Sequence, residues 1–287
     1  MPDIRKIDEA THALEEHINK TGGDRTAYFM DCLQTVLFED SLTGIPNRNF
    51  FDRILPIELS ASARAGQAHA VLFVDTDNLK AINDDEGHQK GDEAIRNTAL
   101  SLKNNLRTSD IVCRNSTKAD EFLALLRSTD TKGAYMTADE IRRLIADDYA
   151  FTISGGVTSS DVVGVPMLYG ERGRDTIAAF LDSDGVAERT MARINEYCSR
   201  SGADKNKALV MLKNVYDFIR LQQKTGGKAP DLGKDFEEIA ARAIVHYADN
   251  AMLKAKQAGK NRIRAYDFDG LGHYTESGVW IPIRMSK

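Results

Sequence analysis

The stretch that decides the fold is Ala70-Val-Leu-Phe-Val-Asp-Thr-Asp77, which continues without a break to Asp92. Five apolar residues, Ala70 to Val74, precede two carboxylates, Asp75 and Asp77. A short apolar run that ends in acids predicts a buried strand whose end carries carboxylates into a cleft. Carboxylates placed there suit a hard divalent cation with open positions for substrate phosphates. The alternative is that they cap the next helix, where Asp and Asn are favoured, but a cap explains one acid and not the whole series.

Composition limits the class of protein. The chain has 287 residues, 42% of them hydrophobic and 28% charged, which is enough for one large or two small domains. Its formal net charge of −5 gives no general attraction to nucleic acid or to an anionic membrane, so neither partner is expected. No apolar run approaches the ~20 residues that span a bilayer, and the N-terminus lacks a signal-peptide core. The cysteines, Cys32, Cys113 and Cys198, are far apart and lack metal-ligand spacing, which favours a reducing cytoplasm.

Hydrophobic periodicity predicts an alternation of strands and helices. Helices are expected over residues 4–39 (with a break at 21–24), 49–64, 77–84, 90–106, 137–147, 175–182, 186–199, 204–223 and 235–258. Strands are expected over residues 68–75, 110–114, 122–127, 151–158 and 262–268, with an edge strand over 279–283. The second and third strands form a hairpin pattern. This order predicts an α/β domain around a mixed central sheet flanked by helices.

Four segments follow from these patterns. Residues 1–39 form an N-terminal helical segment, 40–160 and 241–268 an α/β domain, 161–240 a helical insertion, and 269–287 a C-terminal tail. The N-terminal segment carries an apolar stripe that packs on the main domain or on a second copy, made of Tyr28, Met30, Cys32, Leu33, Val36, Leu37 and Phe38. For the insertion three roles remain open: a cover for the cleft, a surface for a protein partner, or a dimer contact.

Three spaced motifs resemble those of one family. They are the turn DSLTGIPNR from Asp40 to Arg48, the segment from Val74 to Asp92 quoted above, and YADNAMLKAKQAGKN from Tyr247 to Asn261. In this order and spacing the chain resembles the GGDEF domains, which make or bind cyclic di-GMP. The resemblance implies a palm-like α/β fold similar to nucleotidyl cyclases. It also implies that active members condense two GTP molecules, each held by one subunit of a homodimer.

The resemblance also implies roles for individual residues. The metal ions, Mg²⁺ or Mn²⁺, would be held by Asp75, the backbone of Thr76 and Asp120, with Glu121 as a further catalytic acid. The nucleotide would be bound by a set of lysines and polar residues: Lys80, Asn83, Asp92, Lys256 and Lys260. Two metal ions neutralise phosphate charge and activate the attacking hydroxyl, while lysines supply charge to the leaving pyrophosphate.

The hairpin departs from the family pattern. Its signature reads Lys118-Ala-Asp-Glu-Phe122 where the family has Gly-Gly-Asp-Glu-Phe, and the tip is two residues longer. Those glycines allow backbone angles that a Cβ resists close to phosphates. Lys260 also stands where the family has arginine, so a compact ammonium group replaces a planar guanidinium that could form two parallel hydrogen bonds. The sequence therefore favours a protein that binds GTP or cyclic di-GMP with weak or no turnover. The alternatives are an active diguanylate cyclase, or one with another cyclic dinucleotide product, and a purely structural partner-binding domain.

One further motif is Arg107-Thr-Ser-Asp110, which has the R-x-x-D form of the family's inhibitory product site. Arginine beside aspartate suits the phosphate and the guanine edge of cyclic di-GMP. The alternative is a helix-end cap with a local ion pair.

Overall fold

The structure is a computed structural model. It describes residues 37–116, 120–163, 195, 198–199, 204–224, 236–267 and 270–283. Three predictions therefore fall wholly or mainly outside the described residues: most of the N-terminal helical stripe, the helices expected over 175–182 and 186–199, and the hairpin residues Lys118 and Ala119.

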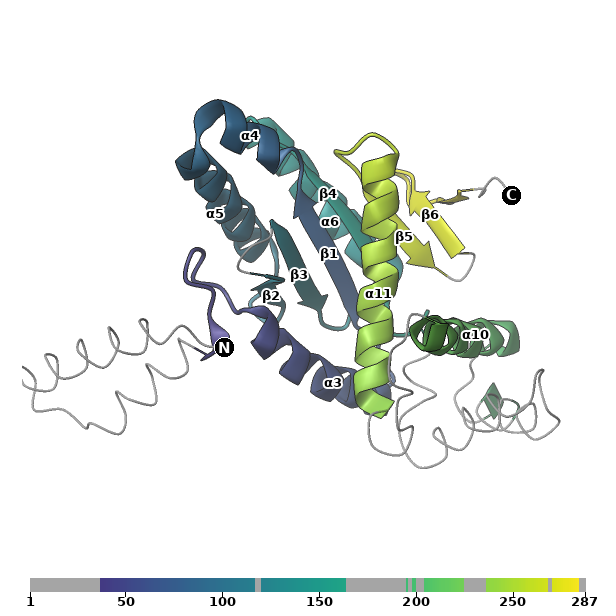
Figure 1. Cartoon of the computed structure of the whole chain (residues 1–287). Helices are drawn as coiled ribbons and strands as arrows, with labels where there is room; N and C mark the ends of the chain where they lie inside the picture. The colour runs from purple at the N-terminus through teal and green to yellow at the C-terminus, as the bar shows by residue number, and fades with distance from the viewer. Residues whose placement is uncertain are drawn as a thin grey trace, which may run out of the picture.

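A single seven-stranded sheet forms the centre of the described chain (Figure 1). Its strand order is β2-β3-β1-β4-β5-β6-β7. The strands are β1 (Ala70–Thr76), β2 (Ile111–Arg114), β3 (Glu121–Leu126), β4 (Ile153–Ser159), β5 (Ile263–Asp267), β6 (Gly270–Tyr274) and β7 (Trp280–Pro282). Neighbouring strands run antiparallel, except that β4 and β5 are parallel. The predicted mixed sheet and its β2–β3 hairpin are confirmed.

Helices cover both faces of this sheet. They are α3 (Arg48–Ala65), α4 (Leu79–Glu86), α5 (His88–Asn105), α6 (Thr131–Asp148), α10 (Lys205–Lys224) and α11 (Phe236–Gln257). Because side chains alternate along a strand, Val71 and Phe73 pack with α3 and α11, whereas Ala70, Leu72 and Val74 pack with α5 and α6. This two-faced burial explains why β1 reads as a continuous apolar run. Within the described ranges, no helix is both long and apolar enough to cross a membrane.

Two elements differ from the sequence-based expectation. Helix α6 begins at Thr131 rather than at 137, because the Asp130 side chain caps it by accepting from the Gly133 N–H at 2.8 Å. Strand β6 was not predicted, since it carries two glycines and lacks an apolar alternation. The indole of Trp280 lies over Gly272, where a Cβ would approach the ring to 2.4 Å. The expected edge strand is confirmed as β7, and β6 joins it to the sheet.

The turn from Asp40 to Arg48 is held by a buried ion pair. Arg114 Nη1 lies 3.1 Å and 3.2 Å from the two Asp40 oxygens, and both side chains are almost fully buried. Thr43 donates to the same carboxylate from its backbone N–H at 3.0 Å and from its hydroxyl at 2.7 Å. This first motif therefore joins the start of the domain to β2.

Helix α10, which lies in the expected insertion, docks on the domain through the buried Asn214. Its amide donates to the Val162 carbonyl at 3.0 Å. Tyr247 of α11 donates to the Asn214 carbonyl at 2.8 Å, and Tyr266 of β5 donates to its side-chain oxygen at 3.0 Å. These bonds join α10 to the turn after β4, to α11 and to β5, so this helix is part of the domain's core.

Candidate metal and nucleotide site

Asp75 lies at the end of β1, opposite Glu121 of β3 on one side and Ser154 of β4 on the other. It is only 3% exposed. Its Oδ2 accepts from Lys256 Nζ of α11 at 2.5 Å, whereas its Oδ1 is buried and has no hydrogen-bond partner among the described residues. Because buried polar atoms are nearly always paired, this orphan oxygen needs a ligand.

The electrostatics of the site point the same way. Burial raises the pKa of Asp75 to about 7, against the opposing effect of its bond to Lys256, and the charges of Asp120 and Glu121 raise it further. Burial also raises the pKa of Asp120 above its usual range. A cation bound between buried carboxylates that repel one another would stabilise their charged forms.

These residues fit a magnesium-type ion. Within the described part of the chain there is no cluster of three or more His, Cys, Asp or Glu side chains that would form a complete metal cage. Mg²⁺ usually takes only one or two carboxylates and leaves its other positions to water and substrate phosphates. Asp75 and Asp120 supply two carboxylates, and the Thr76 N–H donates to the Asp120 carbonyl at 3.1 Å, which joins the two strand ends.

Asp77 has a different role from Asp75. Its carboxylate, 1% exposed, accepts from Thr152 Oγ1 at 2.7 Å, from Ser154 Oγ at 2.8 Å and from the backbone N–H of Asn261 at 3.0 Å. It is fully engaged and is not a metal ligand here. Nor is the capping alternative correct for this pair, since α4 begins at Leu79 with Asn78 as its N-cap residue and has no side-chain cap bond.

The turn after α11 contacts the start of α4. Lys260 and Asn261 both have left-handed backbone angles, with φ of +61° and +43°. Lys260 Nζ donates to the side-chain oxygen of Asn78 at 2.7 Å. Lys260 therefore lies beside the β1–α4 connection, and its role in nucleotide binding stays a prediction.

The proposed base-reading residues lie at the α4–α5 corner. Asn83 packs so closely on Gly91 that a Cβ there would come within 1.9 Å of its Oδ1, and Asp92 is the next residue along α5. Gly87, with φ of +89°, forms the corner between the helices. Asn83 and Asp92 are partly exposed, and Lys80 is exposed on α4. Glycine at position 91 is what allows Asn83 to lie against α5.

Glu121 is held by a residue of the lengthened hairpin. Asn115 Nδ2 donates to Glu121 Oε2 at 2.7 Å, and Asn115 Oδ1 accepts from Arg48 Nη1 at 2.5 Å. Arg48 Nε donates in turn to Asp52 at 2.6 Å. Sequence reasoning missed this chain, although the extra residues after Arg114 marked the place.

A polar cleft of about 290 Å³ opens beside Glu121. It lies between α3, the β1–β3 pair, α10 and α11, and is lined by Arg48, Phe73, Asn115, Glu121, Phe218, Arg242, Val245, His246 and Asp249. Burial raises the pKa of Asp249, and Glu121 raises it further. Phe218 belongs to α10, so part of the expected insertion lines a cleft next to the predicted catalytic acids.

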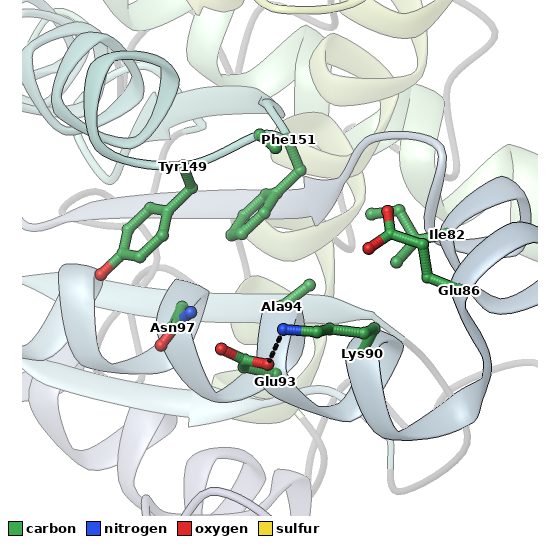
Figure 2. Close-up of a pocket in the computed structure, with 9 residues that line it drawn as sticks. Ile82, Glu86, Lys90, Glu93, Ala94, Asn97, Tyr149 and Phe151 are labelled. Carbon is green, nitrogen blue, oxygen red and sulfur yellow. Dashed lines mark hydrogen bonds and ion pairs between the residues drawn. The ribbon is translucent and has the colours of Figure 1, made fainter.

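A smaller hollow of about 150 Å³ lies between α4, α5 and the segment before β4 (Figure 2). Tyr149 and Phe151 stack along one wall with ring centroids 5.3 Å apart. On the other wall Lys90 is bonded to Glu93 at 2.8 Å (Figure 2). None of the predicted site residues lines this hollow.

The R-x-x-D motif forms a compact turn. Asp110 accepts from the backbone N–H groups of Arg107 and Arg127, each at 3.1 Å. Arg127 is paired with Glu58 of α3 at 2.6 Å. The bonds to these backbone N–H groups account for Asp110 by a structural role, while the Arg107 side chain is exposed. A role for these residues in product binding stays a prediction.

Together the sheet, the buried acid at the β1 end and the lysine from α11 define an α/β domain with a buried acid–lysine pair at the end of an inner strand. Comparison with known proteins is specific about the family. The family model described as "Diguanylate cyclase, GGDEF domain" matches residues 37–171. The chain therefore contains a GGDEF domain, as its motifs predicted.

Curated relatives include the diguanylate cyclase TpbB of Pseudomonas aeruginosa, 37% identical over 149 residues, which are 52% of this chain and 33% of the relative. The response regulator PleD of Caulobacter vibrioides is 33% identical over 135 residues, 46% of this chain and 29% of the relative. The chain thus spans a third or less of the length of these relatives. The coiled coil and GGDEF domain of DgcB from Caulobacter crescentus, solved in complex with c-di-GMP, aligns with a TM-score of 0.53 and 16% identity, over 91% of this chain and 97% of that one. This last likeness shows the fold.

Proposed function

We propose that this GGDEF domain binds a purine nucleotide, GTP and/or cyclic di-GMP, together with Mg²⁺ or Mn²⁺, and that its cyclase turnover is weak or absent. The observation that carries the proposal is the buried Asp75, which has one oxygen on Lys256 and the other without a partner. A divalent cation would satisfy that oxygen and relieve the repulsion between Asp75 and Asp120.

Each predicted residue has a place in this proposal. Asp75, Asp120 and the Thr76 backbone would hold the metal ion, which when bound would neutralise phosphate charge. The ammonium groups of Lys80, Lys256 and Lys260 would attract the triphosphate as point charges. Asn83 and Asp92, an amide and a carboxylate side by side at the α4–α5 corner, would read the guanine edge.

Weak turnover is proposed because of the hairpin. The family's two glycines are replaced by Lys118 and Ala119, whose Cβ atoms resist a close backbone approach to phosphates. The Glu121 carboxylate also accepts a bond from Asn115, one of the residues before the altered signature. A catalytic acid committed to a neighbouring amide is less available to a reacting hydroxyl.

The second candidate is an active diguanylate cyclase that condenses two GTP molecules in a homodimer, or forms a related cyclic dinucleotide. Its specific support is that Asp120 and Glu121, at the start of β3, act electrostatically on Asp75 at the end of β1. The relatives named as diguanylate cyclases support the same class. In either case the domain would work in the cytoplasm, where GTP is available, and the exposed side of α10 would be the surface for a protein partner.

One assay separates the two candidates. The purified chain is incubated with Mg²⁺ or Mn²⁺ and with GTP, ATP or both, and the products are separated by chromatography. Our proposal predicts tight GTP binding with little or no product. A cyclic dinucleotide that forms at a substantial rate and disappears in Asp75→Ala would establish the cyclase. Titration with cyclic di-GMP, repeated with Arg107→Ala, tests the R-x-x-D site, and unchanged affinity would remove Arg107 from it.

A further inference from the structure

The outer part of the sheet carries polar groups that the nucleotide site does not use. Gly156 of β4 faces α11 so closely that a Cβ would come within 2.0 Å of the Ala248 carbonyl oxygen. In the parallel β4–β5 pair, Gly156 lies beside Arg264. Paired residues point to the same face of a sheet, so Arg264 lies on the face of β5 that is turned toward α11. Figure 1 shows α11 lying across this part of the sheet.

His273 of β6 shares this face. The antiparallel register pairs Ala265 with Gly272 and Tyr266 with Leu271, which places His273 directly across from Arg264. Side chains opposite one another on adjacent strands have Cβ atoms about 5 Å apart. Arg262 comes just before β5, and its Nε donates to the Lys260 carbonyl at 2.8 Å. It lies close enough to act electrostatically on both Arg264 and His273.

Two nitrogens of this group are buried and lack partners. Arg264 Nε and His273 Nδ1 have no hydrogen bond to any described residue. Trp280 Nε1 is also without one, but Trp280 packs on Tyr274, the neighbour of His273, and so lies on the opposite face. The fourth such atom is Asp75 Oδ1, where a metal ion is expected. Orphan polar atoms are rare enough that each requires an explanation.

The charged side chains in this group, Arg262 and Arg264, are both positive. Burial lowers the pKa of His273, and the positive charges of Arg264 and Arg262 lower it further. Burial and Arg262 likewise lower the pKa of Arg264. Within the described ranges, no carboxylate forms an ion pair with any of the three. An ordered guanidinium with a buried, unused Nε–H is suited to a phosphate group, which accepts two parallel bonds from the arginine fork.

We propose that Arg264 and His273, with added charge from Arg262, form a binding site for a phosphate group on the α11-facing side of β5 and β6. The positive charges of Arg264 and Arg262 disfavour a metal ion and favour an anion as the occupant. The phosphate would come from a free anion, such as inorganic phosphate or pyrophosphate, or from a nucleotide. This site is on different strands from Asp75 and does not depend on the function proposed above.

The experiment is a titration of the full chain, labelled with ¹⁵N at arginine and histidine, monitored by NMR. Inorganic phosphate, pyrophosphate, GTP and cyclic di-GMP are added separately. The proposal predicts a saturable shift of the Arg264 Nε–H signal, and the ligand that saturates it at the lowest concentration identifies the source. The matched control is Arg143, an exposed arginine of α6 that pairs with Asp139 at 2.7 Å, whose signal should not saturate.

Variants locate the site. Arg264→Gln should weaken pyrophosphate binding at least tenfold, Arg264→Lys should weaken it less, and Arg143→Gln should leave it unchanged. Asp75→Asn should retain the shift at Arg264, which distinguishes this site from the metal-dependent one. The proposal is overturned if Arg264 shows no saturable shift, if the shift is lost in Asp75→Asn, or if the two glutamine variants behave alike.

Discussion

Asp75 and Asp77 are two residues apart, are equally buried, and have opposite surroundings. Asp77 accepts three hydrogen bonds, from the start of β4 and from the turn after α11. One carboxylate oxygen of Asp75 is bonded to Lys256, and the other has no hydrogen-bond partner among the described residues. A carboxylate with filled positions stabilises the fold, whereas one with an empty position is arranged for a ligand. The D-x-D pattern therefore combines one acid that is committed to the fold with one acid that we propose holds a metal ion.

The two acids also differ in what they join. Asp77 connects strands β1 and β4 to Asn261, in the turn whose Lys260 lies against Asn78. Asp75 connects β1 to α11 through one ion pair. Loss of Asp77 should therefore weaken the fold where β1, β4 and the turn after α11 meet, while loss of Asp75 should remove binding and leave the fold intact.

The largest expected effect is on stability. Asp77→Ala leaves Thr152, Ser154 and the Asn261 N–H without their acceptor, which should lower the free energy of unfolding by about 3–5 kcal/mol. Chemical denaturation measures this. Asp84→Ala, an exposed acid on α4, is the control and should change stability by less than about 0.5 kcal/mol. Similar small losses in both variants would show that Asp77 is not a structural acid.

The next effect is a pH dependence that belongs to Asp75. Its pKa of about 7 in the folded protein exceeds the ordinary value of 3.8, so the folded state binds the proton more tightly. Its contribution to stability is therefore fully present below the ordinary pKa and is lost as pH rises to 7. Relative to Asp75→Asn, the wild type should lose up to about 1.4 kcal/mol per pH unit between pH 5 and 7. Parallel stability curves for the two proteins would contradict this.

A smaller effect is expected at Lys256, whose side chain is 30% exposed. Lys256→Gln should cost about 2 kcal/mol at pH 8, because the Asp75 charge loses its partner. The cost should shrink at pH 6, where Asp75 is protonated in the variant. Lys254→Gln is the matched control, since Lys254 bonds Gln257 at the end of the same helix. A cost at Lys256 that does not change with pH would argue against the coupling.

The smallest effect concerns the hairpin. Asn115→Ala removes the bond to Glu121 and should lower stability by about 1 kcal/mol. If that bond restrains turnover, any cyclic dinucleotide formation should rise rather than fall in the variant. Asn105→Ala, which removes only an amide bond to the Ser101 carbonyl within α5, is the control. A fall in product in Asn115→Ala would mean that Asn115 orients Glu121 for catalysis.

Much of the fold was readable from the sequence because periodicity reports burial. The apolar run at Ala70 identified β1, and the hairpin pattern identified β2 and β3. Strand β6 was missed, since its two glycines carry no apolar signal and its place depends on the packing of Trp280 over Gly272, which no local pattern shows. The start of α6 depended on a single cap, Asp130, within a polar stretch.

The site was predicted in part. The motifs identified Asp75, Lys256 and Lys260, and the structure brings Lys256 to Asp75 and Lys260 to Asn78. What separates Asp75 from Asp77 is the set of donors on β4 and after α11, and no local pattern shows which acid they reach. The Asn115 contact to Glu121 was likewise invisible, because it depends on how the two sides of the hairpin face each other.

The most direct test of the account is calorimetric titration of GTP with Mg²⁺ into the wild type, Asp75→Asn and Asp77→Asn. The account predicts that Asp75→Asn loses at least about 100-fold in affinity, roughly 2.7 kcal/mol, with its stability at pH 8 kept or raised. It predicts that Asp77→Asn is less stable than the wild type but, under conditions in which it is folded, retains most of its affinity for GTP. Equal affinity in the wild type and Asp75→Asn would contradict the claim that Asp75 is the metal-binding acid of the nucleotide site.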